Sequence, residues 1–267
     1  MTQYTTLSLK DTLPKVRAEA NKALVLDPRN VDAMVVLANA DASEGKIAAA
    51  KAGYERALAI DPSNVVAHVD YANVLPLKES LAQTLEAVQL DPDYSIEQNN
   101  LAATYMDLGE YQLALAPWQA VMRLDPKSAD SALSLALTYA LLHRNEDAVK
   151  AFDLAKPDTP LAKALVAAGR LTYQSVLDPK LHARALRAVD KLRKRPDLDP
   201  TSTSDLIQLY LALGENHTAL KLLPQNCAAQ PFGCNDLSIN PMYLPLRGDP
   251  HFKALVQKYD TVSKPPQ

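Results

Sequence analysis

The sequence has few of the residues on which catalytic and cofactor sites depend. Its seven glycines form no phosphate-binding loop, and the serine-elbow, zinc-protease and P-loop motifs do not occur in its 267 residues. The five histidines lie far apart, with no metal-ligand spacing to one another or to either of the two cysteines. We therefore expect a protein that is not an enzyme and that uses no metal or other cofactor.

Charge and hydropathy exclude further classes of function. The formal net charge of −3 gives no global field to attract nucleic acid, so an electrostatic partner requires a local patch. The segment MTQYTTLSLK lacks the apolar stretch of a signal peptide, and the longest uncharged apolar run, 131–142, is too short to span a bilayer. We expect no membrane span in this chain. Its compartment stays open: periplasmic for a region of a membrane-anchored regulator, cytoplasmic otherwise.

One pattern, an apolar stretch that ends in Asp-Pro, recurs along the chain. Stretches such as KALVLDP and RALAIDP end in Asp-Pro, and the prolines are Pro28, Pro62, Pro92, Pro126 and, in a degenerate copy, Pro160. The spacings between these prolines are 34, 30, 34 and 34 residues. A 34-residue period predicts tetratricopeptide units, each made of two helices and a turn. Because proline cannot continue a helix, the Asp-Pro pair marks the end of each second helix.

Other positions agree in phase when the units are aligned on these prolines. Small residues occupy the helix-crossing position, large rings the second helix and mostly glycine the turn: Ala38, Ala72, Ala102 and Ala136; Tyr54, Trp118 and Phe152; Gly45, Gly109 and His143. The second unit lacks four residues and has Pro76 at its turn, which predicts a shortened hairpin. Pro117 predicts a kink or local break in the second helix of the third unit. We predict an all-α, right-handed tetratricopeptide solenoid.

Four segments are expected along the chain. They are an N-terminal extension (1–12), a repeat array (13–160), degenerate repeat-like helices (161–224) and a C-terminal cap with a loop and a short helix (225–267). Within the array, a half unit at 13–28 precedes units at about 31–64, 65–94, 95–128 and 129–160. The half unit has no complete first helix, so its apolar face requires a cover. A second copy of the chain is one candidate for that cover.

Two segments carry a more specific resemblance. LPKVRAEANKALVLDPRNVDAMVVLA, the repeats after it and the tail NPMYLPLRGDPHFKALVQ resemble the C-terminal tetratricopeptide regions of bacterial multidomain signalling proteins. These include CadC-like winged-helix regulators, adenylate cyclases and serine/threonine kinases, and the resemblance covers about residues 13–260. It implies a sensor or interaction region that binds a protein. This chain contains no winged-helix, kinase or cyclase motif, so the resemblance implies neither DNA binding nor catalysis.

The resemblance also implies a peptide-binding groove lined by the first helix of each unit. An asparagine amide both donates and accepts a hydrogen bond, so spaced copies suit the backbone of an extended peptide. The candidate groove residues are Asn39, Asn73, Asn99, Asn100, Leu133 and Leu137. The asparagines have two other readings, as solvated groups or as partners in hydrogen bonds within the solenoid. The leucines have one, burial where the groove narrows.

A basic stripe is the second candidate binding feature. Five cations alternate spacings of four and three residues, which places them on one helix face: Lys180, Arg184, Arg187, Lys191 and Lys194. Such a stripe suits an anionic partner. No aromatic residue is interleaved for base stacking, so no specific nucleic acid is expected. A solvated face is the alternative reading.

The C-terminal cap suggests an alternative function. Cys227 and Cys234 bracket the loop AAQPFG, and they form a disulfide in an oxidising compartment or two free thiols in a reducing one. The rings that are candidates to line a small-molecule pocket, or to form core, are Tyr210, Phe232, Tyr243 and Phe252. A small-molecule or redox sensor in the cap is therefore the alternative to a peptide-binding scaffold.

Overall fold

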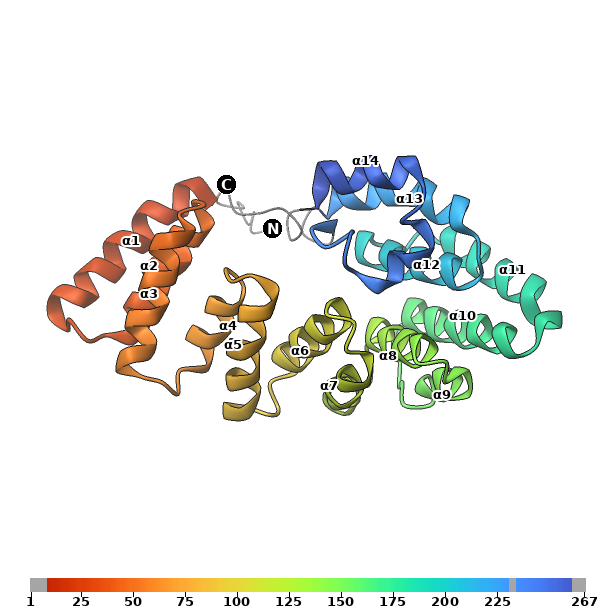
Figure 1. The fold of residues 1–267 in the computed structure, drawn as a ribbon, viewed down its shortest axis with the longest axis horizontal. Coiled ribbons are helices and arrows are strands. Elements are labelled where there is room, and N and C mark those ends of the chain that lie inside the picture. The colour runs from red at the N-terminus through yellow and green to blue at the C-terminus, as the bar shows by residue number, and fades with distance from the viewer. Residues whose placement is uncertain (1–8, 231–233, 261–267) are drawn as a thin grey trace, which may run out of the picture. The chain divides into compact units, whose positions relative to one another are not determined.

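A computed structural model describes residues 9–230 and 234–260, and every regular element in those two ranges is a helix (Figure 1). The predicted all-α class is confirmed. In chain order the elements are α1 (Leu9–Leu26), α2 (Val31–Ser43), α3 (Ile47–Ile60), α4 (Val65–Ala72), α5 (Leu77–Leu90), α6 (Ser95–Asp107), α7 (Tyr111–Leu124), α8 (Ala129–Leu141), α9 (Asn145–Ala151), α10 (Pro160–Leu177), η1 (Pro179–Leu181), α11 (His182–Arg193), α12 (Pro200–Ala212), α13 (Asn216–Ala229), η3 (Pro241–Leu246) and α14 (Pro250–Tyr259).

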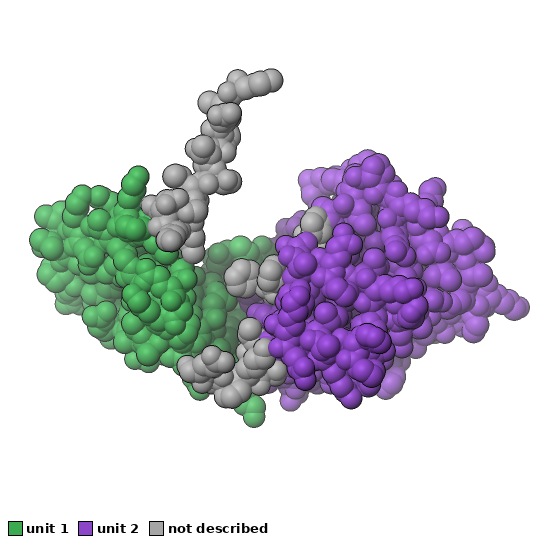
Figure 2. All heavy atoms as spheres, turned by 90° about the horizontal axis from the view of Figure 1, so that it is seen from above, with its two compact units in different colours: residues 1–97 green, residues 98–267 purple. Residues whose placement is uncertain are grey.

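The chain divides into two compact units, an N-terminal unit of residues 1–97 and a C-terminal unit of residues 98–267 (Figure 2). The division falls inside α6, within the predicted repeat array (13–160) and three residues after the expected end of a repeat at residue 94. Each unit is described by itself below.

The N-terminal unit is built from helices that pair with their neighbours in sequence. α1 packs on α2, α2 pairs with α3, and α4 pairs with α5. Ala38 and Ala50 are buried at the α2–α3 crossing beside the ring of Tyr54, as the repeat pattern predicts. α4 has only eight residues, and Pro76 directly precedes α5, so this hairpin is shortened as expected.

α1 covers most of the range 13–28, where a half unit was expected. Arg17 fixes it to α2, donating to Asp41 at 2.7 Å and to Glu44 at 2.8 Å. Val25 is 82% exposed and Leu26 is 87% exposed. These two side chains therefore form an open apolar end to α1.

The C-terminal unit has a continuous core that begins at α6 and α7 and extends to α14. Trp118 is buried in this core, and α7 continues unbroken through Pro117. α10 lies tightly against the preceding pair: a Cβ on Gly169 would come within 2.7 Å of Phe152 and 2.9 Å of Leu133. Glycine at 169 therefore permits this approach, which positions α10 for the groove described below.

The last part of the C-terminal unit closes the array. α12 pairs with α13, as the sequence pattern predicts, and η3 contacts both helices. The rings of Tyr243 in η3 and Phe252 in α14 lie 5.6 Å apart and are both buried. α12 also reaches back to α8, because the amide of Gln208 donates to the carbonyl of Leu133 at 2.8 Å.

Candidate functional site

The first predicted groove residue, Asn39, is engaged within the N-terminal unit. Its amide nitrogen donates to Asp70 of α4 at 2.7 Å, and its amide oxygen accepts a hydrogen bond from the hydroxyl of Tyr54. Burial raises the pKa of that hydroxyl above its ordinary value, so Tyr54 stays a hydrogen-bond donor. Asn39 therefore joins α2, α3 and α4. This is the arrangement expected if the asparagine makes hydrogen bonds within the solenoid.

The other asparagines differ in their surroundings. Asn73 is exposed at the end of the short helix α4. Asn99 and Asn100 lie half-buried on α6 in the C-terminal unit. The four predicted residues thus fall in two units as two pairs, and the structure does not test whether they bind a peptide.

The two leucines that were predicted to line the groove differ in burial. Leu133 is fully buried between helices, so its predicted place on an open groove is corrected: it packs in the core beside Gly169. Leu137 remains half-buried and lines a cavity of about 140 Å³ together with Leu141, Pro241 and Met242. The chain's own η3 segment therefore contributes to the surface that was expected to hold an apolar anchor.

A group of carboxyl side chains lies beside Leu137 in the C-terminal unit. Asp107, Asp130 and Asp236 line a cavity of about 180 Å³ with Trp118 and Gln208. None of the described residues that line this cavity is a lysine or arginine. The group cannot be recognised from sequence, because its members come from α6, α8 and the cap.

Burial governs the protonation of these carboxyls. It raises the pKa of Asp107 to about 8, and the nearby negative charge of Asp236 adds to the shift. Asp130 and Asp205 hydrogen-bond to each other, and the pKa of each is raised, chiefly by burial. Asp205 is buried, whereas Asp130 is exposed to solvent. Two carboxyl groups can hydrogen-bond to each other only when one of them carries a proton, which is consistent with the raised pKa of both.

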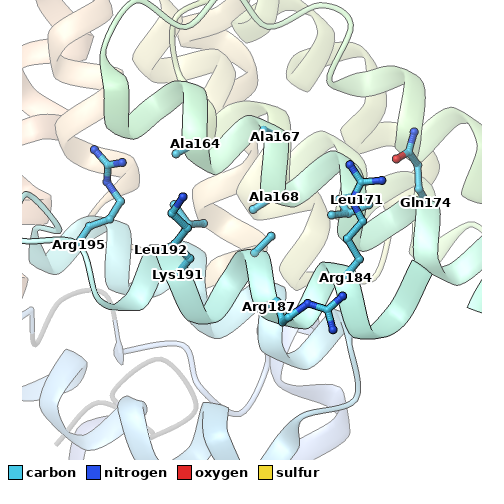
Figure 3. Close-up of a pocket in the computed structure, with 11 residues that line it drawn as sticks. Ala164, Ala167, Ala168, Leu171, Gln174, Arg184, Arg187, Lys191, Leu192 and Arg195 are labelled. Atoms are coloured by element: carbon cyan, nitrogen blue, oxygen red, sulfur yellow. The ribbon is translucent and has the colours of Figure 1, made fainter. Parts of the chain in front are cut away.

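The basic stripe lies along a groove between α10 and α11 in the C-terminal unit (Figure 3). The groove encloses about 600 Å³. α10 contributes Ala164, Ala167, Ala168, Leu171 and Gln174, and α11 with the residues after it contributes Arg184, Arg187, Ala188, Lys191, Leu192 and Arg195. Three of the five predicted stripe residues therefore flank an apolar floor. Lys180 and Lys194 are exposed outside the groove.

The charges of this groove are of one sign. Arg184, Arg187 and Lys191 are exposed, and none has an ion-pair partner among residues 9–230 and 234–260. Arg195, in contrast, holds Asp197 through two bonds of 2.8 and 2.6 Å. The one acidic residue of α11, Asp190, accepts a hydrogen bond from Tyr210 of α12 at 2.8 Å. The sequence analysis found these cations but missed the floor, which depends on how α10 and α11 face each other.

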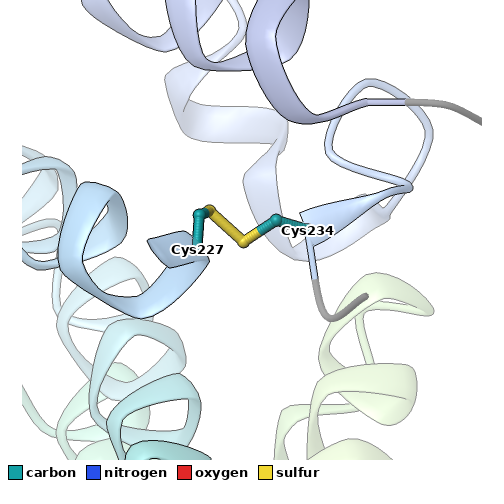
Figure 4. The surroundings of a disulfide bond; sticks show 2 residues. All are labelled: Cys227 and Cys234. Atoms are coloured by element: carbon teal, nitrogen blue, oxygen red, sulfur yellow. A yellow bond between two sulfur atoms is a disulfide. The ribbon is translucent and has the colours of Figure 1, made fainter. Parts of the chain in front are cut away.

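The cap contains the disulfide that the sequence analysis left open (Figure 4). Cys227 of α13 and Cys234 are joined with their Cα atoms 5.5 Å apart, and both residues are fully buried. Tyr210, Tyr243 and Phe252 are buried core residues, and Phe232 lies outside the described residues. These three rings therefore do not line an open pocket. A different cavity of the cap, about 500 Å³, lies between α13 and α14 and is lined by Leu220, Pro224 and Leu255 among others.

Two further kinds of feature are absent from the described part of the chain. No group of three or more histidine, cysteine, aspartate or glutamate side chains in residues 9–230 and 234–260 is arranged to hold a metal ion. No helix in the same ranges combines the length and the apolar character that a membrane crossing requires.

The helix pairs, their small crossing residues and their Asp-Pro ends define a tetratricopeptide-type helical solenoid. The crystal structure of a tetratricopeptide repeat protein from Parabacteroides merdae matches it with a TM-score of 0.58 at 15% identity, covering 93% of this chain and 92% of that chain. The structure of Naa15/Naa10 bound to HypK-THB matches with a TM-score of 0.51 at 18% identity, covering 94% of this chain and 40% of that chain.

A shorter match is the crystal structure of MamA, with a TM-score of 0.47 at 19% identity, which covers 56% of this chain and 94% of that chain. No family model matches the sequence, and no curated protein matches it. At these identities the likeness is one of fold. The binding function has to be argued from the surface of this chain.

Proposed function

We propose that this chain is a non-catalytic scaffold that binds a protein partner, with the groove between α10 and α11 as its contact surface. One observation carries the proposal: Arg184, Arg187 and Lys191 are exposed beside a floor of alanine and leucine side chains, with no ion-pair partner in the part of the chain that the structure describes. If these cations formed only a solvated helix face, they would not need an apolar floor beside them. Aliphatic surface supplies contact area, and a row of like charges selects the partner.

Site-specific crosslinking in the native cells tests this proposal. A photoreactive amino acid at Ala167, which is exposed on the groove, should capture a protein that mass spectrometry identifies. The same group at Ala183, which is exposed on α11 but does not line the groove, is the matched control. The purified protein should then bind this chain directly, and Arg187→Glu should weaken that binding. Equal capture at both positions would contradict the proposal.

We also propose that the chain serves as the sensor or interaction region of a bacterial signalling protein. The support is the sequence resemblance over about residues 13–260. In cells that carry Arg187→Glu and Lys191→Glu, a regulatory role predicts a change in a discrete set of transcripts or phosphoproteins. Unchanged profiles, with the variant protein present at its normal level, would argue against a signalling role.

The peptide groove remains a narrower proposal. Asn73, Asn99 and Asn100 keep side chains that are at least partly accessible, and Leu137 lines a small cavity. Asn39 contributes through the hydrogen bonds that hold α2, α3 and α4 together. An Asn73→Ala variant should lose affinity for an extended peptide without losing stability, and unchanged affinity would remove Asn73 from the site.

A further inference from the structure

The groove between α10 and α11 extends along about three turns of each of the two helices. Its lining residues on α10 run from Ala164 to Gln174 and those on the other side from Arg184 to Arg195, each at spacings of three and four residues. That spacing keeps one helix face toward the groove for three turns, or about 15 Å at 1.5 Å per residue. Figure 3 shows the two rows along the neighbouring helices α10 and α11. The two rows form parallel ridges, between which a third row of side chains can pack.

The floor favours a helical occupant over an extended one. Alanines at 164, 167, 168 and 188 are small, so a third helix can approach closely. An extended segment would bring unpaired backbone N–H and C=O groups onto this floor, where Gln174 is the single amide side chain of the lining. A helix satisfies its own backbone groups and therefore loses nothing on this surface.

The cations of the groove indicate that the docked helix carries carboxylates along one edge. Arg184, Arg187 and Lys191 follow one another at three and four residues along α11, so successive cations lie about one turn apart. α10 carries no acidic side chain, and the acidic residue of α11 is held by Tyr210. The cations are thus left for carboxylates that come from outside this surface, and arginine suits a carboxylate through paired hydrogen bonds.

We propose that the partner docks here through an acidic amphipathic helix. Small or apolar residues of that helix cover the alanine and leucine floor, and aspartate or glutamate residues one turn apart face Arg184, Arg187 and Lys191. This inference rests on the proposed scaffold function and names the class of partner for the same groove. It is the helix-in-groove mode of recognition, with a salt-dependent edge.

Synthetic peptides test the inference on the full chain. The probe is a labelled 18-residue helix with alanine and leucine on one face and glutamate at every third or fourth position beside that face. The matched controls are the same peptide with lysine for each glutamate and a scrambled peptide of identical composition. Fluorescence anisotropy should show at least tenfold tighter binding of the glutamate helix than of either control, with affinity that falls as salt is raised.

Variants of exposed groove residues locate the binding. Arg187→Glu with Lys191→Glu should weaken the glutamate helix at least tenfold and strengthen the lysine helix. Ala167→Phe should fill the floor and weaken the glutamate helix while every cation stays in place. Ala183→Phe, outside the groove, is its control. Circular dichroism and the thermal midpoint show that each variant is folded.

Three results would overturn the inference. One is equal binding of the glutamate helix and the scrambled peptide, and another is binding that Arg187→Glu with Lys191→Glu leaves unchanged. The third is charge-dependent binding to vesicles of phosphatidylcholine and phosphatidylglycerol with none to the glutamate helix, which would assign the groove to a lipid surface. If crosslinking at Ala167 captures a protein that carries no acidic helix, this inference fails while the proposed scaffold function stands.

Discussion

Asn39 has one of the roles that the sequence left open, as a partner in hydrogen bonds between the repeat helices. Its position on the first helix of a repeat predicts a groove residue, but its amide bonds to Asp70 and Tyr54. Asn39→Ala should lower the free energy of unfolding by about 1–3 kcal/mol, because it leaves the buried Tyr54 hydroxyl without its partner. Urea denaturation measures this, with Asn73→Ala as the exposed control, for which a loss under about 0.5 kcal/mol is expected. Equal stability of the two variants would contradict the network.

Asp107 links one side chain to the pH dependence of stability. Its pKa is raised to about 8 in the folded chain, against about 3.9 in an unfolded one. The folded state therefore holds the proton more tightly, and stability is lost as pH rises from about 4 to about 8. Asp107→Asn cannot ionise, so it should be more stable than the parent at pH 8.5, with a difference that shrinks toward pH 4. Urea denaturation across this range checks the sign, and a difference that does not vary with pH would contradict it.

His143 occupies a backbone conformation that favours glycine. Its φ is 58°, and Gly45, Gly109 and Gly214 take φ of 74°, 78° and 76° at the corresponding turns. A non-glycine residue pays about 1–2 kcal/mol there, while glycine costs more backbone entropy on folding, so His143→Gly should stabilise by about 0.5–1 kcal/mol. Thermal unfolding measures this. Gly109→Ala should shift stability in the opposite direction, and a loss in both variants would be inconsistent with strain at His143.

At the scale of elements, α7 depends on one large side chain. Trp118 is 5% exposed and packs in the core of the C-terminal unit. Trp118→Ala should therefore lower the free energy of unfolding by about 3–5 kcal/mol, the range for a large ring removed from a core. Leu113→Ala on the same helix is the control, because Leu113 is 52% exposed. A loss under about 1 kcal/mol for the Trp118 variant would show that α7 is rotated from the position described here.

The C-terminal end of α13 is a second element with a single dominant restraint. The Cys227–Cys234 disulfide closes a loop with a sequence separation of 7. Loop-closure entropy for a ring of this size corresponds to about 2–3 kcal/mol. Replacing both cysteines with serine should therefore destabilise the oxidised protein by about that amount. A reducing agent should lower the stability of the parent chain to about that of the variant, and it should not change the stability of the variant. Identical stability of parent and variant under oxidising conditions would contradict this role.

At the scale of the whole molecule, the repeat pattern predicted the fold because it is local. Alanine at 38 and the rings at 54 and 118 lie at fixed offsets from Asp-Pro, and their burial follows from helix period and spacing alone. The groove between α10 and α11 could not be predicted in this way. Its floor depends on tertiary contacts, because α10 packs on Phe152 and Leu133 at Gly169. The cluster of carboxyl side chains around Asp107 could not be predicted from sequence for the same reason, because tertiary packing brings its members together.

The contact between Gln208 of α12 and the carbonyl of Leu133 of α8 has a consequence for cooperativity. In a linear array each repeat touches only its neighbours, and unfolding can begin at one end and proceed unit by unit. Here α12 bonds across the intervening pair α10–α11 to α8, and η3 lines the same small cavity as Leu137 of α8. Fraying of α12 and α13 therefore exposes part of α8 as well. We therefore expect the C-terminal unit to unfold more cooperatively than a linear array, so that the α10–α11 groove persists until most of the unit has unfolded.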